Sequence, residues 1–517
     1  MHPSSNPKIR SAAQAAALIG NDATLAITGA GGGLVEPEEI LAAIERRFLD
    51  TGEPHGLTLV HGQGLGDGER RGLNRLAHEG LVARVIGAHW SWSPRMQALA
   101  AADKIEAYAL PGGVIQHLLR AVAAGRPGLI THIGLDTMAD PRREGGRMNA
   151  RAAAPISELL TIDGRPYIRY KPLAVDFAIL RGSLADAKSN ISFAEEGANL
   201  DALVLAMAAH NCGGKVLMQV RAEVAGGTLA ARTVTVPGAL VDALVVVPTQ
   251  PQSYAGAFDQ QLSGSTPRLD QNQTIDEPSR PGPLERRIVG ARASAELQGA
   301  GIVSFGFGMP DEVCLLGAQH GDLDNYQQTL DHGHYGGRSL QGPLFGFVRN
   351  GEALIDSPSQ FDFYSGGGID IAFVGFGEFD QQGDVNVSKL GGKIIGPGGF
   401  IEMTQETRKI VFCGTFEAKG LEIAVADGRL QILSPGKIAK AVATVEQVTF
   451  SGRRARASGK EVLFVTERAV FRLLAEGLAL EEIAPGIDLQ RDLLDRMGFA
   501  PIIRPGFPRL MAAPPCF

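Results

Sequence analysis

The sequence predicts an α/β protein with two similar open domains, each built on a largely parallel sheet. Short apolar runs that end in glycine alternate with amphipathic helical stretches, a pattern typical of parallel sheets covered by helices. Three sequence patterns of the first half recur in the same order in the second half. The chain has 517 residues, enough for roughly two to four domains. Together these observations indicate a duplicated α/β unit.

The individual elements follow from local patterns. Runs rich in Val, Ile and Leu between turn residues predict strands at TLAIT, LTLVHG, ALVVVP, KIVFCG, LEIAVA and VLFVT. The amphipathic stretch PEEILAAIERRFL predicts a helix, with Pro37 suited to its start. We also expect helices over LERRIVGARASAELQ and over TERAVFRLLAEG, where Thr466 would be the N-cap.

The repeat rests on three pairs of segments that keep their order along the chain. In the second pair, the matched position is a carboxylate in the second half of the chain and an apolar residue in the first half. The pairs are 25–39 with 302–312, 58–64 with 329–335 (Val60 with Asp331), and 175–192 with 369–388 (Asp176 with Asp370, Asn190 with Asn386).

The predicted division of the chain places two domains on either side of a linker. Residues 1–250 form the first domain and residues 285–517 the second, which carries the carboxylate. Residues 251–284 are rich in Pro, Gln, Ser and Asp and lack an apolar pattern, so they are interpreted as a linker. A surface loop is the alternative for that segment.

The most informative segment runs from Asp331 to Gly399. It holds 17 glycines in 69 residues. Glycine lets bare backbone N–H groups approach a ligand closely. A carboxylate beside such loops suggests acyl chemistry, with the carboxylate as nucleophile and amides that hold an oxyanion. A turn residue or helix cap is the alternative for Asp331 considered alone.

The stretch FDFYSGGGIDIAFVGFGEFDQQGDVNVSKLGGKIIGPGGFIEMTQETRKIVFCGTF resembles family I CoA-transferases, most closely the single-chain acetate/propionate/acetoacetate type. Further stretches agree, among them HGQGLGDGERRGLNRLAHEGLVARVIGAHW and VEQVTFSGRRARASGKEVLFVTERAVFRL. The similarity runs in order from about residue 20 to about residue 500. It implies two open α/β domains of the CoA-transferase type.

One departure from the family pattern concerns the nucleophile. The family reads Thr-Val-Glu-x-Gly-x-x-Gly-Gly, with Glu as the covalent nucleophile, whereas this chain has Thr-Leu-Asp at Thr329, Leu330 and Asp331. The carboxylate is retained on an arm that is one methylene shorter. The resemblance therefore assigns the nucleophile to Asp331.

The resemblance implies a ping-pong transfer of CoA between a short-chain acyl-CoA and a free carboxylic acid. The acyl group would pass to Asp331 as an anhydride, and CoA would then form an enzyme thioester. CoA is a substrate, and no other cofactor and no metal are expected. By the same resemblance we expect oxyanion donors at Gly398 and Gly399, and CoA contacts at Gly366, Gly367, Gly368 and Lys389.

The remaining candidates are weaker. Gln63, His332 and His334 are expected in the substrate pocket, with a structural role as the alternative for Gln63. For each glycine of the site an ordinary turn is the alternative, and for Lys389 it is a solvated side chain.

A hydrolase is the alternative function. Shortening the arm moves the carboxylate by about one bond length, roughly 1.5 Å. A shift near 1 Å can cost on the order of a hundredfold in rate. The gap also leaves room for a water that His332 or His334 could activate. Asp331 would then be nucleophile or base in an acyl-CoA hydrolase or a related CoA-ester lyase.

Composition sets the remaining expectations. A net charge of −7 argues against a broad nucleic-acid surface. The sequence has no apolar run suited to a membrane span and no apolar signal core at its N-terminus, so a cytoplasmic protein is expected. The cysteines lack metal-site spacing, and Cys314 and Cys413 lie in apolar runs that predict buried thiols. By resemblance we expect a homo-oligomer, a dimer or a tetramer.

Overall fold

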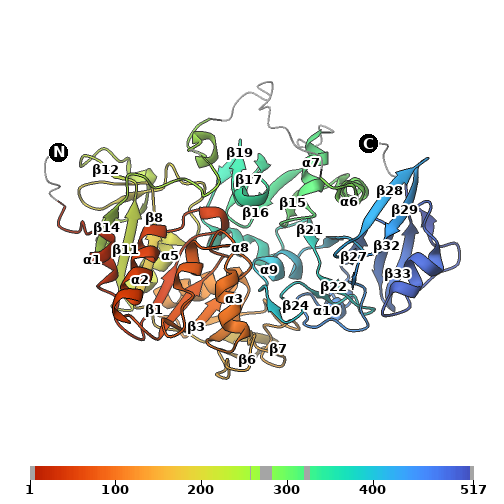
Figure 1. Cartoon of the computed structure of the whole chain (residues 1–517), viewed down its shortest axis with the longest axis horizontal. Coiled ribbons are helices and arrows are strands. Elements are labelled where there is room, and N and C mark those ends of the chain that lie inside the picture. The colour runs from red at the N-terminus through yellow and green to blue at the C-terminus, as the bar shows by residue number, and fades with distance from the viewer. Residues whose placement is uncertain (1–5, 257, 268–281, 320–325, 513–517) are drawn as a thin grey trace. The chain divides into compact units, whose positions relative to one another are not determined.

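The computed structural model in Figure 1 describes residues 6–256, 258–267, 282–319 and 326–512. It confirms the α/β class, because parallel strands alternate with helices along the chain. The chain forms two compact units. Unit 1 comprises residues 1–268, 331–362 and 391–402, and unit 2 comprises residues 269–330, 363–390 and 403–517.

Unit 1 is built on a seven-stranded parallel sheet with the strand order β14-β11-β8-β1-β2-β3-β4. Most side chains of these strands are buried, as is typical of parallel sheets. The predicted runs TLAIT, LTLVHG and ALVVVP supply three of the strands. The strands are β1 (Thr24–Ile27), β2 (Leu57–His61), β3 (Val82–Gly87), β4 (Glu106–Ala109), β8 (Phe177–Arg181), β11 (Lys215–Val220) and β14 (Ala243–Val246).

Helices and small sheets complete unit 1. The predicted helix over PEEILAAIERRFL is α2, whose first residue is Glu38 because Pro37 is its N-cap. The other helices that lie wholly within this unit are α1 (Ala12–Ala16), α3 (Pro94–Ala101), α4 (Gly112–Ala123) and α5 (Ala202–Asn211). The small sheets have the orders β12-β9-β10-β13 and β5-β7-β6, with β5 (Leu129–Thr131), β6 (Ser157–Ile162), β7 (Arg165–Tyr170), β9 (Leu184–Ala185), β10 (Ile191–Ser192), β12 (Ala222–Glu223) and β13 (Val234–Val236).

Unit 2 contains a mixed sheet with the strand order β16-β15-β21-β26-β31-β32-β33-β34. Its first five strands are parallel, and the pairs β31–β32 and β32–β33 are antiparallel. The strands are β15 (Ile302–Phe305), β16 (Gln327–Leu330), β21 (Ile371–Gly375), β26 (Lys409–Cys413), β31 (Glu461–Val465), β32 (Ala469–Leu474), β33 (Gly477–Ile483) and β34 (Arg509–Leu510). Outside this sheet lie α6 (Leu284–Ser294), α7 (Asp311–Gln319), α10 (Gly452–Ala457), β28 (Glu422–Ala426) and β29 (Arg429–Ser434).

The stretch TERAVFRLLAEG forms a strand, so the predicted helix is wrong. β32 returns antiparallel to β31, and Thr466 lies in the turn between them. The Thr466 hydroxyl donates to the carbonyl oxygen of Ala469 at 2.8 Å and accepts the N–H of Arg468 at 3.3 Å. Pairing of β32 on both edges overrides the local helix propensity, because strand preference is set by the surrounding sheet.

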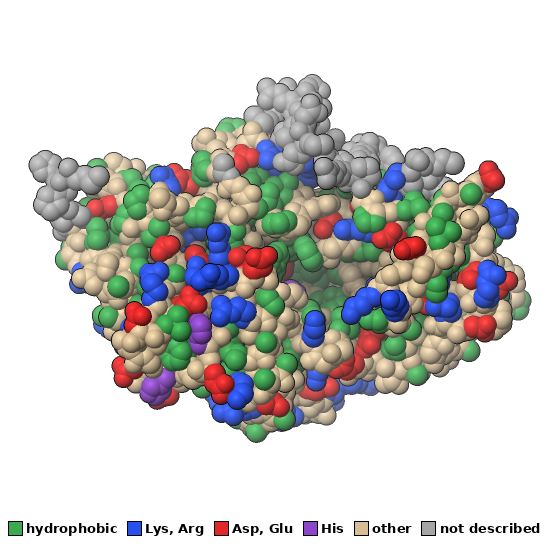
Figure 2. Space-filling model, in the orientation of Figure 1, with side chains coloured by type: hydrophobic (Ala, Val, Ile, Leu, Met, Phe, Trp, Pro, Cys, Tyr) green, Lys and Arg blue, Asp and Glu red, His purple; other side chains and the backbone are tan. Residues whose placement is uncertain are grey.

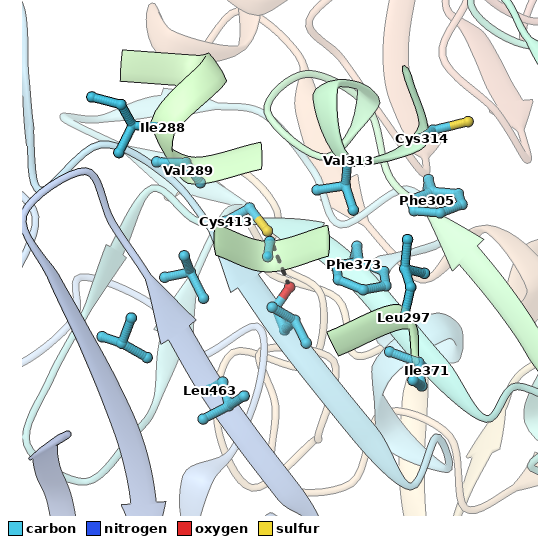
Figure 3. Packing of buried hydrophobic residues seen from close by; sticks show 14 of the residues in the cluster. Ile288, Val289, Leu297, Phe305, Val313, Cys314, Ile371, Phe373, Cys413 and Leu463 are labelled. Atoms are coloured by element: carbon cyan, nitrogen blue, oxygen red, sulfur yellow. Dashed lines mark hydrogen bonds between the residues drawn. The ribbon is translucent and has the colours of Figure 1, made fainter. Parts of the chain in front are cut away.

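The hydrophobic core of unit 2 includes two cysteines, Cys314 and Cys413 (Figure 3). Cys314 is 5% exposed and Cys413 is 1% exposed, which confirms the prediction that both are buried. Burial raises the pKa of the Cys413 thiol, so it stays protonated at neutral pH. A protonated thiol in an apolar core acts as a packing group rather than as a nucleophile.

The face of the molecule in Figure 2 carries charges of both signs. Lys and Arg side chains are interspersed there with Asp and Glu side chains. Within the described ranges, no helix combines the length and the apolar character that a bilayer crossing needs.

Five strands of each sheet follow the same parallel order. In unit 1 the order β2-β1-β8-β11-β14 is parallel throughout, and in unit 2 the order β16-β15-β21-β26-β31 is also parallel throughout. The predicted equivalence of Asp176 and Asp370 is confirmed by a shared hydrogen bond. Asp176 accepts the N–H of Thr24 at 2.8 Å, and Asp370 accepts the N–H of Ile302 at 2.8 Å. This common order agrees with the predicted duplication, whose origin stays a prediction.

Hydrogen bonding corrects the predicted pairing of Asn190 with Asn386. Asn190 accepts the N–H of Gly238 through its side chain at 2.9 Å, and Asp384 accepts the N–H of Gly452 at 2.7 Å. The counterpart of Asn190 is therefore Asp384, two residues before the predicted one.

Strand register likewise corrects the predicted pairing of Val60 with Asp331. Asp176 and Asp370 are equivalent, so the residues that follow them, Phe177 and Ile371, are equivalent too. Leu25 pairs with Phe177, and Val303 pairs with Ile371, so Leu25 corresponds to Val303. Leu25 faces Leu59, and Val303 faces Gln328. Three residues further along, Gly62 corresponds to Asp331. The similar letters of residues 58–64 and 329–335 suggested the wrong pairing. In the structure the two segments match only after a shift of two residues.

Residues 251–256 of the predicted linker pack within unit 1. Tyr254 donates to carboxylate oxygens of Glu36 and Glu38 at 3.0 and 3.2 Å. The carbonyl oxygen of Pro251 accepts a hydrogen bond of 2.6 Å from the buried guanidinium of Arg181. These contacts make residues 251–256 a structured part of the unit, whereas 268–281 lie outside the described residues.

Candidate active site

Asp331 directly follows the last residue of β16, Leu330. The chain then turns at Gly333, whose φ of +105° suits glycine alone. A methyl group at Gly333 would lie 2.1 Å from the carbonyl oxygen of Ile355, so the turn is closely packed. The chain continues into β17 (His334–Tyr335), which pairs antiparallel with β20 (Ala353–Leu354). This turn fixes the backbone from which the Asp331 side chain projects.

The Asp331 carboxylate is mostly buried, and it forms no hydrogen bond with any residue that the structure describes. Its side chain is 13% exposed, and its Oδ1 lies 3.0 Å from Nδ1 of His332. The angles at this contact do not make a hydrogen bond, and Oδ1 has no hydrogen-bond partner within the described chain. Oδ2 faces Gly399, and the methyl group of an alanine at position 399 would lie 2.9 Å from this oxygen. A carboxylate with free lone pairs in a partly dry site is suited to nucleophilic attack.

The two predicted oxyanion glycines differ in their hydrogen bonding. The N–H of Gly398 donates to the carbonyl oxygen of Ala88 at 2.9 Å, so it is already used. The carbonyl oxygen of Gly398 accepts the N–H of Gly112 at 2.8 Å. The N–H of Gly399 makes no hydrogen bond within the described residues. Of the pair, Gly399 alone has a donor available for a ligand.

We expect Gly399→Ala to lower turnover by about a hundredfold, because a 1 Å displacement at a reacting centre costs about that much. The new methyl group would press on Oδ2 of Asp331 at 2.9 Å and on Cε1 of Phe361 at 3.1 Å. Overpacking of this kind typically costs about 1–3 kcal/mol in stability. Gly20→Ala is the matched control, because a methyl group there meets nothing within 4 Å. Steady-state kinetics and thermal melting of both variants check the result, and unchanged turnover in Gly399→Ala would contradict it.

Glu402 holds the glycine loop against helix α4. Glu402 belongs to α9 (Phe400–Gln405), is fully buried, and accepts the N–H of Val114 at 2.9 Å. Together with the Gly112 bond to Gly398, it satisfies donors at the N-terminus of α4. Sequence reasoning missed Glu402, because an acidic residue in a short helix carries no sign of a cap supplied to a distant helix.

Burial raises the pKa of Glu402 to about 7, against the hydrogen bond from Val114, which lowers it. Because this folded-state pKa lies above the ordinary 4.5, the folded protein binds the proton more tightly than the unfolded chain. The stabilisation is complete below about pH 4.5 and is lost as the pH rises toward about 7.

We therefore expect Glu402→Gln, which cannot ionise, to gain stability relative to the wild type between about pH 4.5 and pH 7. The relative gain should reach about 3 kcal/mol at pH 7, because the shift from 4.5 to about 7 corresponds to about 1.4 kcal/mol per pKa unit and Glu402 is half ionised at that pH. Thermal melting across this range measures it, with the exposed Glu53→Gln as control. A constant difference between Glu402→Gln and the wild type at all pH values would refute the assignment.

His332 adjoins the carboxylate, whereas His334 lies two residues beyond. His332 is 3% exposed and packs edge-on against Phe345, with ring centroids 5.8 Å apart. His334 is also 3% exposed, and burial lowers its pKa to about 4. A neutral, buried imidazole is a poor acid at neutral pH, and a place for His334 in the substrate pocket stays a prediction.

Gln63 lies just beyond the end of β2. The residue is 6% exposed, and its Nε2 has no hydrogen-bond partner within the described chain. The carbonyl oxygen of Gln63 lies 2.6 Å from Nδ1 of His61, which orients the loop. A buried amide with an unused donor is compatible with the predicted contact to a substrate carboxylate, and that role stays a prediction.

The predicted CoA contacts lie in unit 2. Gly367 has a φ of +83°, and a methyl group at Gly368 would lie 2.3 Å from the ring of Phe363. These two constraints account for glycine there without a ligand. Lys389 is half-buried in β24 (Lys389–Leu390). Roles for Gly366, Gly367, Gly368 and Lys389 in CoA binding stay predictions.

A residue that sequence reasoning missed, His89, also belongs to this site. It follows β3, and a methyl group at Gly398 would lie 3.7 Å from its Cδ2. Burial lowers the pKa of His89 to about 4, against the opposing influence of the Asp331 charge. The signal in the sequence was a single histidine after an apolar strand, which is common in proteins without active sites.

The chain is similar to known coenzyme A transferases in sequence and in fold. The family model "Coenzyme A transferase" matches residues 9–247. "Acetate CoA-transferase YdiF" of Escherichia coli O157:H7 is 40% identical over 511 residues, which cover 98% of this chain and 96% of that protein. "Caffeate CoA-transferase" of Acetobacterium woodii is 41% identical over 509 residues, 96% of this chain and 95% of that protein. A crystal structure of the Escherichia coli O157:H7 acyl-CoA transferase YdiF, described as a thioester complex with CoA, has a TM-score of 0.91 and 40% identity, with 97% of this chain and 94% of that chain covered.

Proposed function

The chain belongs to the coenzyme A transferase family, as a single-chain family I enzyme, and we propose that Asp331 is the nucleophile through which it transfers CoA between an acyl-CoA and a carboxylic acid. One observation carries this role. The Asp331 carboxylate lies at the end of β16 with its Oδ1 buried and unpaired and its Oδ2 facing Gly399. The thioester complex of the Escherichia coli relative supports a covalent enzyme–CoA intermediate.

The proposed reaction proceeds by two exchanges on Asp331. The carboxylate attacks the thioester carbonyl carbon, the C–S bond breaks, and CoA leaves as a thiolate while an acyl-aspartyl anhydride remains. The thiolate then attacks the Asp331 carbonyl carbon, which releases the first carboxylic acid as its anion and forms the enzyme–CoA thioester. A second carboxylate reverses these steps and departs as its CoA ester.

Each tetrahedral intermediate develops a negative charge on the former carbonyl oxygen. The free N–H of Gly399 is the proposed donor to that oxygen, and such a donor is worth about 3–4 kcal/mol. The rigid bonds of Gly398 to Ala88 and Gly112 keep the neighbouring amide in place before the reaction starts. Preorganised donors lower the barrier because no reorientation is needed at the moment of reaction.

Short-chain carboxylic acids are the proposed substrates, as the acetate CoA-transferase relative suggests. A caffeate CoA-transferase is similar to the same extent, so aromatic acids belong in the test. Acetyl-CoA offered with propionate, butyrate and caffeate in parallel identifies the acceptor class. We also propose that the enzyme is cytoplasmic and that it forms a homo-oligomer, a dimer or a tetramer. Light scattering of the purified protein tests the oligomeric state.

The decisive experiment traps the intermediate. Borohydride reduces the carbonyl of an enzyme–CoA thioester to an alcohol, so mass spectrometry after incubation with acetyl-CoA should find Asp331 converted to homoserine. No modification of the peptide that contains Asp331, in a preparation that transfers CoA, would exclude it as the nucleophile.

Hydrolysis is a second candidate activity, favoured by one observation. Nδ1 of His332 lies 3.0 Å from Oδ1 of Asp331, close enough to orient a water toward an acyl group on that carboxylate. Assays with acetyl-CoA in the presence and absence of an acceptor acid separate the two activities, because hydrolysis proceeds with water alone.

A further inference from the structure

The backbone on both sides of His89 is tied to the glycine loop of the site. The carbonyl oxygen of Ala88 accepts the N–H of Gly398 at 2.9 Å, and the N–H of Trp90 donates to the carbonyl oxygen of Ile395 at 2.7 Å. These bonds hold His89 directly beside the loop that carries Gly399. Its position relative to that loop is therefore fixed by covalent and hydrogen-bonded neighbours.

The His89 ring lies close to one glycine in each of two loops, Gly64 and Gly398, and Trp92 borders the same space at Gly64. A methyl group at Gly64 would lie 2.9 Å from Nδ1, and one at Gly398 would lie 3.7 Å from Cδ2. Neither ring nitrogen forms a hydrogen bond with any described residue. Consecutive glycines thus face the two polar groups of the site, because Gly398 adjoins His89 and Gly399 adjoins Oδ2 of Asp331.

The charge state of His89 matters for the nucleophile. Burial lowers its pKa to about 4, although the Asp331 charge acts in the opposite direction. At neutral pH the ring is therefore neutral, with one N–H donor and one acceptor nitrogen. A cationic imidazolium beside Asp331 would bind the carboxylate as an ion pair and weaken its attack, whereas a neutral ring leaves it free.

We propose that His89 is a catalytic residue that donates a hydrogen bond from its neutral imidazole to the oxyanion of the intermediates formed on Asp331. This inference rests on the proposed function and adds a second donor to the N–H of Gly399. When Asp331 attacks the thioester, the carbonyl π electrons move to oxygen, and that oxygen accepts both hydrogen bonds. When the C–S bond breaks, the carbonyl re-forms, and no proton leaves His89 at any step.

The test compares three substitutions of His89 in the full-length enzyme, with acetyl-CoA and propionate as substrates. His89→Leu removes the donor and keeps an apolar side chain, so kcat should fall by about 100- to 1,000-fold, the usual loss for one oxyanion donor. KM for acetyl-CoA should change little, because the hydrogen bond strengthens only as the oxyanion forms. His89→Gln places an amide near Nε2 and His89→Asn places one near Nδ1, so one of these should recover at least tenfold over His89→Leu.

A structural role would give a different pattern. It would lower the melting temperature, and all three variants would lose activity together. The exposed His210→Leu on α5 is the control, and it should behave as the wild type. A kcat for His89→Leu within threefold of the wild type, or equal losses in the three variants, overturns the proposal.

A single-turnover measurement separates this inference from the proposed function. The rate at which acetyl-CoA forms the borohydride-sensitive adduct on Asp331 is followed in the wild type and in His89→Leu. A slower but complete adduct in His89→Leu supports the donor role. An equally fast adduct overturns the role of His89 alone, whereas absence of the adduct from the active wild type overturns the assignment of Asp331 first.

Discussion

Asp331→Asn should abolish CoA transfer while the protein keeps its fold. A carboxamide is a poor nucleophile and cannot form the anhydride or the thioester, and loss of a nucleophile lowers kcat by about 10⁴- to 10⁶-fold in comparable covalent enzymes. Stability should be unchanged or higher, because Oδ1 has no hydrogen-bond partner within the described chain and the substitution removes a mostly buried charge.

The measurement pairs steady-state transfer from acetyl-CoA to propionate with thermal melting. The exposed Asp50→Asn at the end of α2 is the control for a general effect of removing a carboxylate. Mass spectrometry of the purified Asp331→Asn variant confirms that the introduced carboxamide has not deamidated back to a carboxylate. Transfer within tenfold of the wild type, with that carboxamide intact, would remove Asp331 from the mechanism.

Asp331→Glu should raise the ratio of transfer to hydrolysis, on the order of a hundredfold, because about 1 Å of displacement at a reacting centre has that effect. The longer arm restores the side chain of the family pattern and moves the carboxylate by about one bond length, roughly 1.5 Å. The space that it enters adjoins Gly399, which has no side chain to block it. The same arm fills the room that a water beside His332 would need.

Assays with and without propionate give the ratio for both proteins, and Asp50→Glu is the matched control. If the loop is instead adapted to aspartate, the added methylene overpacks the site at a cost of about 1–3 kcal/mol, and both activities fall together. An unchanged ratio with unchanged rates would place the reacting carboxylate elsewhere. The two Asp331 variants therefore test the identity of the nucleophile and its reach separately.

The sequence alone determined the fold class and the position of the proposed nucleophile. The apolar runs at TLAIT and KIVFCG became β1 and β26, because a short Val- and Ile-rich segment between turns has few alternatives to a buried strand. Asp331 was assigned because its segment resembles the nucleophile motif of family I CoA-transferases, and the glycine-rich stretch that follows it agrees with that assignment. Such local arrangements need no knowledge of distant partners.

Tertiary structure decided what depends on contacts between distant segments. The backbone at Gly398 is bonded to Ala88 and Gly112, which leaves Gly399 as the available donor of the predicted pair. Likewise His89 lies against the glycine loop, and Glu402 completes the N-terminus of α4. β32 became a strand because its two neighbours pair with it, against its local helix pattern. In each case the free energy comes from hydrogen bonds and burial between residues far apart in sequence, and local patterns do not encode those pairings.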